Sequence, residues 1–393
     1  MQVILNEAQA LDVAHEFARS VAVGARERDA TRTLPWQEVE QFSQSGLWGV
    51  TIPREYGGAG VSTGVLAKIV SLIAAADGNF GHIPQNHYYS LEVLRVGGSE
   101  AQKSFFYDRV LRGERLGNAL AETGQRDFKR RTRLLREADG WFIEGAKFYC
   151  TGAIYAHWIP TLAVAQEDGA ERSYLVFVPR TAPGVTITDD WDGFGQRVTG
   201  SGSVRFEHVR VEPAWVVPFS SSFERATTIG PFAQIIHAAL DAGIGHGALQ
   251  ATLPFVRDHA RPWIDAGVPS ASQDPLLLEQ IGNVHLRLRA ADALIARAAQ
   301  AVDAAQQEPD EDTVAAASIA VAQAKTLSTS ASLLASTKLF ELSGTSATST
   351  TLGLDRFWRN ARTHTLHDPV RWKYHAVGNY VLNGVRPPRH GAI

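Results

Sequence analysis

The spacing of apolar residues changes twice along the chain, and this constrains the fold more than any other feature. Up to about residue 112, apolar residues recur at helical spacing, as in 35–45 and 65–76. The next segments, WFIEGAKFYCTGA, ERSYLVFVPR, GVTIT and GSVRFEHVRV, are short and rich in β-branched and aromatic residues, which predicts strands. Later runs are long and rich in Ala and Leu, which predicts helices. The expected α+β fold has a helical N-terminal domain (1–112), a β middle domain (113–222) and a C-terminal helical bundle (223–393).

Charge and length favour small-molecule chemistry. The 393 residues are 45% hydrophobic, enough to build cores for several domains. Lys and Arg number 38 against 41 Asp and Glu, without long blocks of one sign, so no nucleic-acid or membrane partner is expected. No apolar run is long enough to cross a bilayer, and the first 20 residues carry charges where a signal peptide is apolar. We therefore expect a cytoplasmic protein.

Sulfur-containing residues are scarce. The one cysteine, Cys150, excludes an internal disulfide and a multi-thiolate metal site, and no metal is expected. The one methionine is the first residue. Such economy suits a protein made during sulfur starvation and favours an organosulfur substrate, although compositional drift is an alternative explanation.

Three strings, in this order along the chain, resemble the acyl-CoA dehydrogenase superfamily. They are GLWGVTIPREYGGAG, NALAET at 118–123 and GAKFYCTGA at 145–153. The resemblance covers nearly the whole chain and implies that the middle domain is a β-barrel and the C-terminal domain a four-helix bundle. It also implies that Tyr149 and Thr151 lie against a flavin. From one string alone, Tyr149 and Thr151 would be interpreted as ordinary strand residues, and the order of three strings along one chain reverses that preference.

The departures from the dehydrogenases concern their catalytic base. Those enzymes use a glutamate from a C-terminal loop or from a helix at the start of the bundle. The loop here reads RNARTHTLHDPVRWK, with His364 and His367, and the helix position falls near His237. Without a carboxylate, thioester dehydrogenation loses its proton acceptor.

The string THTLHDPV instead resembles the flavin-dependent monooxygenases of this superfamily, among them dibenzothiophene monooxygenases. These enzymes use reduced flavin from a separate NAD(P)H:flavin reductase and oxygenate through a flavin C4a-hydroperoxide. Imidazoles suit that chemistry because they donate or accept protons near neutral pH. The residues that the resemblance assigns to the oxygen reaction are His367, His82, Thr151, Asn118 and His364.

Some of these histidines have an equally good structural interpretation. A lone histidine can instead be a structural residue whose ring nitrogens are hydrogen-bonded in the core. For His364 and His87, the catalytic and the structural interpretation are evenly matched. Asn86 stands where the related monooxygenase has a tyrosine, and the neighbouring His87 is a candidate substitute for that phenol.

The residues expected to bind the phosphate end of the flavin also differ from those of the dehydrogenases. Their dinucleotide-binding strings are replaced by ARPW at 260–263 and SGTSATS at 343–349. An arginine with short hydroxyl side chains suits a terminal phosphate, which favours FMN over FAD, and a plain bundle turn is the alternative. The expected cofactor-binding residues are Tyr149, Thr151, Asn118, Arg261, Ser343, Gly344, Thr345 and Ser346.

A basic segment, GQRDFKRRTRLL at 124–135, lies next to these strings. The related monooxygenases have a mobile loop over the flavin pocket at this place, which predicts a lid. A solvated charged loop is the alternative.

The sequence therefore predicts a two-component monooxygenase that uses reduced FMN and O₂ on a small apolar heteroatom compound, with sulfur favoured. The resemblance implies a homotetramer. Two alternatives stay open: an FAD-dependent oxidoreductase like the acyl-CoA dehydrogenases, and an inactive flavin-binding protein.

Overall fold

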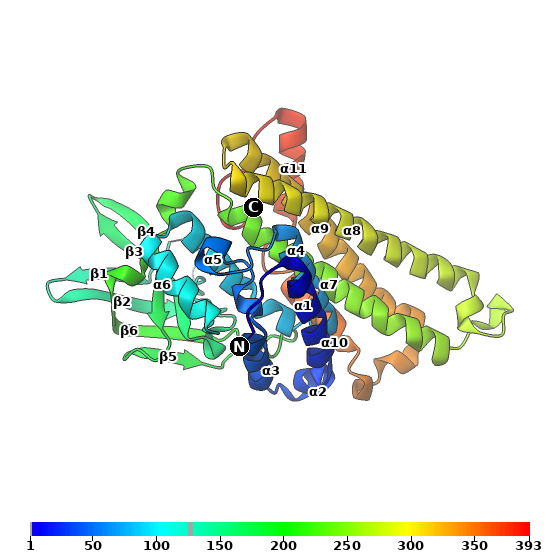
Figure 1. Cartoon of the computed structure of the whole chain (residues 1–393). Helices are drawn as coiled ribbons and strands as arrows, with labels where there is room; N and C mark the ends of the chain where they lie inside the picture. The colour runs from blue at the N-terminus through cyan, green and yellow to red at the C-terminus, as the bar shows by residue number, and fades with distance from the viewer. Residues whose placement is uncertain (1, 125–128) are drawn as a thin grey trace.

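The structure is a computed structural model that describes residues 2–124 and 129–393. Figure 1 shows a β-sheet at one end of the molecule, long helices at the other, and the N-terminal helices packed between them. The helical, β and helical order predicted from the sequence is confirmed. The helix α6 ends at Leu111 and α7 begins at Ile229, and on these bounds we propose domains at 1–112, 113–222 and 223–393.

The described part of the N-terminal region contains six α-helices. Several begin at side-chain caps that satisfy free backbone N–H groups: Ser62 caps α4, and Ser99 forms a capping box with Gln102 at α6. The helices are α1 (Glu7–Ala22), α2 (Ala25–Thr31), α3 (Trp36–Ser45), α4 (Thr63–Ala76), α5 (Gln85–Gly97) and α6 (Glu100–Leu111).

The described residues of the middle region, 113–124 and 129–222, form one sheet of seven strands in the order β5-β6-β2-β1-β3-β4-β7. Only β1 and β3 pair in parallel, and the other neighbours in this order are antiparallel. Its strands are β1 (Arg133–Glu137), β2 (Gly140–Lys147), β3 (Trp158–Glu167), β4 (Ala170–Pro179), β5 (Val185–Thr188), β6 (Ser203–Val211) and β7 (Val216–Pro218).

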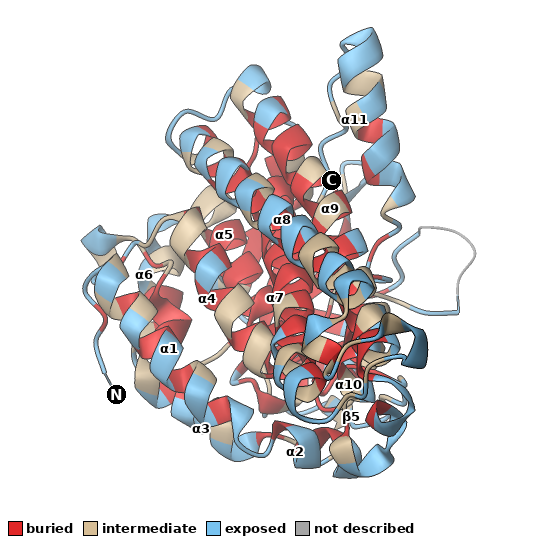
Figure 2. Cartoon of the chain, turned by 90° about the vertical axis from the view of Figure 1, so that its right-hand side faces the viewer, coloured by how far each residue is buried: buried red, intermediate tan, exposed pale blue. Residues whose placement is uncertain are grey.

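The C-terminal bundle has α7 at its centre. Every residue of this helix from Ile229 to Gly245 is buried, which is typical of a helix surrounded by others. Figure 2 shows α7 buried behind the half-exposed α8, and α4 and α9 also pack against it. The bundle helices are α7 (Ile229–Asp258), α8 (Pro275–Gln307), α9 (Glu311–Ser343), α10 (Asp355–His364) and α11 (Arg371–Asn383). Among the described residues, no helix has the length and apolar character needed to cross a membrane.

Candidate active site

Four histidines that are far apart in the sequence meet where α7, α10 and the N-terminal region touch. His82 ends a short 3₁₀ turn (Phe80–His82), His237 lies on α7, His364 ends α10, and His367 lies in the following loop. The ring centres of His237 and His367 are 3.9 Å apart, those of His82 and His364 4.9 Å, and those of His237 and His364 5.2 Å. The structure thus brings together three histidines predicted for the oxygen reaction and adds His237.

A buried ion pair supports two of these histidines. Asp241 is one helical turn after His237, so both face the same side of α7. Its Oδ1 lies 2.5 Å from His364 Nδ1, and its Oδ2 lies 2.7 Å from Lys325 Nζ. Thr329 also donates to Oδ2, at 2.9 Å. His364 Nε2 in turn lies 3.0 Å from His237 Nδ1, so a continuous chain runs from Lys325 to His237.

Burial and charge set the protonation of this chain. Burial alone would raise the pKa of Asp241, but Lys325 and His364 outweigh it and hold this pKa at about 2. Burial lowers the pKa of His82 and His237 well below the usual value for imidazole, and nearby histidines lower it further. Burial also lowers the pKa of His364 despite its contact with Asp241. At neutral pH the buried imidazoles are therefore neutral beside an ionised Asp241–Lys325 pair.

Gln196 organises the other side of the cluster. Its Oε1 lies 3.1 Å from His82 Nδ1, and its Nε2 donates to the Gly78 carbonyl at 2.9 Å. Its backbone N–H donates to Asn360 Oδ1 at 2.7 Å. Gln196 has φ +55°, a conformation that costs residues other than glycine energy and is common at functional sites. These contacts hold it in that conformation.

Thr151 joins the same network through hydroxyl groups. Its Oγ1 is 2.7 Å from Ser201 Oγ, which is 2.6 Å from Thr199 Oγ1, and Thr199 donates to the Gln196 carbonyl at 2.9 Å. The adjacent Gly152 packs against Ile83, the residue after His82. The predicted neighbours Thr151 and His82 therefore share one network.

Asn118 and Tyr149 lie beside this network. The Asn118 side chain donates to the Tyr149 carbonyl at 3.2 Å and accepts from the Leu120 N–H at 3.1 Å. Tyr149 has φ +55° and exposes 49% of its surface. Its exposed aromatic ring is available to a flat ligand.

The residues predicted for the phosphate lie elsewhere in the same chain. Ser343 ends α9, and Leu342 and Ala260 belong to one small apolar cluster, which brings 343–346 to the same end of the bundle as Arg261. Ser343 follows Lys325 by 18 residues on α9, about 27 Å along the helix axis. Lys325 belongs to the histidine cluster, so Ser343 lies far along the bundle from that cluster.

His87 has a structural role. Its Nδ1 accepts from the Leu116 N–H at 3.0 Å, and its Nε2 lies 2.9 Å from the Trp48 carbonyl. Both ring nitrogens are thus occupied by main-chain groups, which argues against His87 as a substitute for the missing tyrosine. In the predicted basic lid, 125–128 lie outside the described residues, and Arg133 begins β1.

The sequence did not reveal Asp241, Lys325, Gln196 or Ser201 as part of the site. A charged residue inside the apolar stretch that became α7, and another inside α9, were the only signals available, because buried charges are rare unless paired. Nothing in the local sequence around Gln196 or Ser201 distinguishes them from ordinary loop residues.

The histidines also have the composition of a metal site. Nitrogens of His82, His237 and His364 lie within 4.8 Å of one another, and neutral imidazoles are good ligands. However, both nitrogens of His364 are already used, by Asp241 and by His237. An ion would have to break the bond between His237 and His364, so the geometry favours a proton-handling site.

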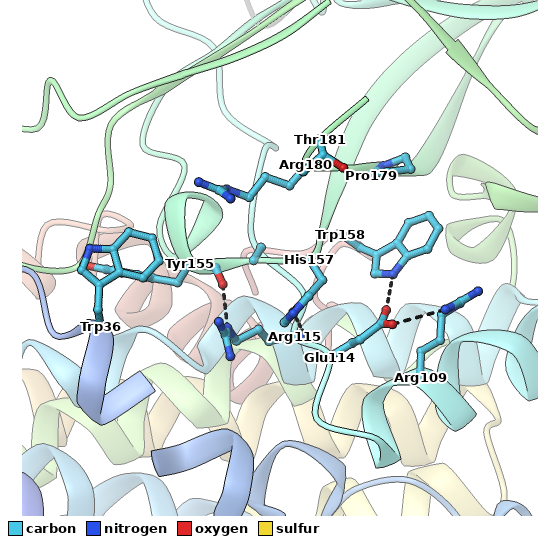
Figure 3. A pocket seen from close by; sticks show the side chains of 11 residues that line it. Trp36, Arg109, Glu114, Arg115, Tyr155, His157, Trp158, Pro179, Arg180 and Thr181 are labelled. Atoms are coloured by element: carbon cyan, nitrogen blue, oxygen red, sulfur yellow. Dashed lines mark hydrogen bonds and ion pairs between the residues drawn. The ribbon is translucent and has the colours of Figure 1, made fainter. Parts of the chain in front are cut away.

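A separate cleft of about 320 Å³ lies between the sheet and the N-terminal helices (Figure 3). Arg109 pairs with Glu114, which also accepts from Trp158, while Arg115 donates to the Tyr155 carbonyl. None of the residues predicted for the active site lines this cleft. The histidine cluster is therefore the better candidate for catalysis.

Comparisons with known proteins agree with this geometry. Models of the N-terminal, middle and C-terminal domains of acyl-CoA dehydrogenase match residues 6–114, 121–209 and 235–372. The chain belongs to the acyl-CoA dehydrogenase family. Within this family it is 35% identical over 390 residues to a dibenzothiophene monooxygenase of Rhodococcus erythropolis, covering 95% of this chain and 93% of that protein. It is 32% identical to a probable FMNH₂-dependent monooxygenase, SfnC, of Pseudomonas putida, with 96% of each chain covered.

A solved member of the family has nearly the same fold. TdsC from Paenibacillus sp. A11-2, in a complex with FMN and indole, superposes with a TM-score of 0.93 at 32% identity, covering 98% of this chain and 99% of TdsC. The predicted fold and the predicted resemblance to the monooxygenase branch are confirmed. The roles of the individual site residues stay predictions.

Proposed function

We propose that this protein is a two-component flavin-dependent monooxygenase that uses reduced FMN and O₂ to oxygenate a small apolar organosulfur compound. The observation that carries the proposal is that the carboxylate in contact with the histidines is buried and fully occupied by other side chains. Asp241 is fully buried and bound by Lys325, Thr329 and His364. It cannot approach a substrate as a base, which argues against acyl-CoA dehydrogenation.

Several features fit FMN. Tyr149 offers an exposed ring, and Thr151 and Asn118 offer polar groups beside it. At the other end of the bundle, the buried Ser343 hydroxyl has no hydrogen-bond partner among the described residues, and Arg261 is exposed nearby. An unpartnered buried hydroxyl is costly unless a ligand such as a phosphate satisfies it.

Because Ser343 lies about 27 Å along α9 from Lys325 in the histidine cluster, we propose that each FMN is bound by two chains of a homotetramer. Exposed apolar side chains support assembly: Leu276, Leu278 and Leu286 on α8, and Trp372, Val381 and Leu382 on α11. The cytoplasmic location and the partner reductase stay predictions from the sequence and from the resemblance.

Bound reduced FMN supplies the electrons that activate O₂. The chain's own groups orient and protect the reaction. The buried His82, His237 and Thr151 exclude water around the ring, which limits loss of reduced oxygen as peroxide. The His367 side chain is 41% exposed and contacts Asp368, so it can exchange protons with solvent and deliver them to the reacting oxygen.

The function is tested by mixing the protein anaerobically with reduced FMN and then admitting O₂, with dibenzothiophene as the test substrate. We expect largely colourless purified protein and one oxygenated product per flavin oxidised. Firmly bound FAD that acyl-CoA reduces would overturn the proposal.

The variant His367→Ala should keep its fold and FMN affinity but release hydrogen peroxide. Product formation should fall by about 10²- to 10⁴-fold, with a far smaller change in flavin oxidation, because a general acid is lost. His367→Gln keeps a donor but cannot titrate, so it separates positioning from proton transfer. Full product yield per flavin in His367→Ala would remove His367 from the catalytic site.

A further inference from the structure

The hydroxyl chain from Thr151 has a fixed direction. A backbone carbonyl can only accept a hydrogen bond, and each hydroxyl has one hydrogen to donate. Thr199 must therefore donate to the Gln196 carbonyl, Ser201 to Thr199, and Thr151 to Ser201. No other assignment makes all three contacts hydrogen bonds. The Thr151 hydrogen is thus directed away from any ligand, and its oxygen is left with free lone pairs.

The same reasoning fixes the His82 ring. Because Gln196 Nε2 donates to the Gly78 carbonyl, Gln196 Oε1 is the atom that faces His82 Nδ1. An amide oxygen only accepts, so Nδ1 carries the ring hydrogen. Nε2 of the neutral ring is then an acceptor, and it has no hydrogen-bond partner among the described residues.

Hydrogen-bond direction is also fixed along the contacts from Asp241 through His364 to His237. The ionised carboxylate only accepts, so His364 Nδ1 carries a hydrogen, and in the neutral ring His364 Nε2 carries none. His237 Nδ1 must donate to that bare nitrogen. This leaves Nε2 of His237 as an acceptor as well, again without a partner among the described residues.

We infer that the Thr151 oxygen forms an acceptor edge that selects reduced FMN over oxidised FMN, while His82 and His237 contribute further acceptors within the histidine cluster. The inference rests on the proposed placement of the flavin beside Thr151. Reduced flavin carries a hydrogen on N5 and can donate it to this edge. Oxidised flavin has a lone pair on N5, which would face another lone pair and lose a hydrogen bond. The acceptor edge therefore binds incoming reduced FMN and releases FMN after it has been oxidised.

The decisive variant is Ser201→Ala. Ser201 acts through Thr151 as a positioning residue, since its oxygen is the acceptor that holds the Thr151 hydrogen away from the ligand. Without it, Thr151 can turn and donate to oxidised N5. The ratio of dissociation constants for oxidised over reduced FMN should fall about 3- to 10-fold, mainly through tighter binding of oxidised FMN. A tenfold change corresponds to about 30 mV in the two-electron potential of bound FMN.

A second variant, Thr199→Val, tests the chain from its other end. Ser201 then loses its acceptor and can donate to Thr151, which reverses the chain and also frees the Thr151 hydrogen. Both variants should therefore shift the ratio in the same direction, which loss of packing alone would not do. Ser336→Ala is the matched control, because Ser336 is a buried serine on α9 that bonds only to Ser332 and Leu333 carbonyls, and its ratio should stay unchanged.

Oxidised 5-deaza-FMN provides a probe that needs no mutation. A C–H group replaces N5, so the lone pair that opposes the acceptor edge is gone. Wild-type protein should bind this analogue more tightly than oxidised FMN, and the difference should shrink in Ser201→Ala. If reduced FMN binds but neither variant changes the ratio, or if wild type binds both redox states equally, the inference is wrong. Failure to bind reduced FMN at all would instead overturn the proposed function.

Discussion

At the residue scale, two side chains organise the candidate site. Gln196 uses its amide, its N–H and its carbonyl to connect His82, Asn360 and Thr199. Asp241 connects Lys325 with His364. Neither needs to touch a substrate, because each fixes which nitrogen or oxygen of a neighbour carries the hydrogen.

Removing the charge of Asp241 should be strongly destabilising. Asp241→Asn leaves Lys325 buried without its counter-charge, which should lower the free energy of unfolding by about 3–5 kcal/mol. The double variant Asp241→Asn, Lys325→Met should recover much of this loss. Urea unfolding measures both. The matched control is Asp292→Asn, because Asp292 is a partly exposed carboxylate that contacts Arg289 on α8 and His246 on α7. This change should cost at most about 1 kcal/mol. Equal losses in the two single variants would contradict the buried pair.

At the element scale, the close packing of α7 against α4 sets the distance between the two sides of the site. A side chain added at Gly243 would lie 2.5 Å from the Ser71 carbonyl and 2.8 Å from Ala74. At Gly247 it would lie 2.4 Å from the Ala75 carbonyl. The helices can approach this closely only because these α7 positions lack side chains. His237 and Asp241 are on α7, so their placement depends on this contact.

Gly243→Ala should therefore push α7 from α4 and lower stability by about 1–3 kcal/mol through overpacking. It should also increase peroxide release, because His237 moves relative to His82. Gly282→Ala is the control on α8, where an added methyl group would meet nothing within 4 Å. That change should stabilise by up to about 1 kcal/mol through helix propensity alone. Thermal or urea unfolding distinguishes the two, and stabilisation by both would show that α7 and α4 are not tightly fitted.

At the scale of the whole molecule, burial of neutral imidazoles links folding to pH. Burial lowers the pKa of His82, His87, His237 and His364, and that of His87 falls to about 3. In the unfolded chain each pKa is about 6.5. The unfolded state thus binds more protons below pH 6.5, so the stability present above that pH is lost as the pH falls.

The free energy of unfolding should decrease between pH 6.5 and pH 5 by up to about 5 kcal/mol per pH unit if all four imidazoles stay neutral in the fold. Asp241 does not contribute in this window. Its pKa is lowered, so its stabilisation is complete above its unfolded pKa of about 3.9 and is lost only towards pH 2. Urea unfolding at pH 7.5, 6.5 and 5.5 tests this. His87→Gln should reduce the pH dependence of the free energy of unfolding by the contribution of one proton. The control His15→Gln, at an exposed position, should not. A free energy of unfolding that does not change with pH would contradict the assignment of neutral, buried imidazoles.

The proposed sharing of FMN between chains can be tested by complementation. His82→Ala damages the reactive end of the site and Arg261→Ala the phosphate end, and each alone should lower product formation. If two chains build one site, co-expression should create sites in which one chain supplies His82 and the other Arg261. Activity should then return in the mixed oligomers, measured as product per flavin oxidised. No recovery in oligomers shown to contain both variants would place the whole site in one chain.

The sequence by itself determined the kind and order of the elements. Periods of 3.6 and 2 residues in the apolar pattern distinguish helices from strands because each period places side chains on one buried face. The predicted helices at 35–45 and 65–76 are α3 and α4, and the strings read as strands supply β2, β4, β5 and β6. The string THTLHDPV likewise pointed to His364 and His367, because it is a local pattern.

Only the tertiary structure decided which hydrogen bonds and ion pairs connect the residues of the site. Asp241 and Lys325 are 84 positions apart, and His82 and Gln196 are 114 apart, so no local pattern links them. Whether Thr151 or His82 offers a hydrogen or a lone pair depends on partners brought together by folding. The physical reason is that apolar periodicity acts over a few residues, whereas burial, ion pairing and hydrogen-bond direction arise from contacts between distant segments.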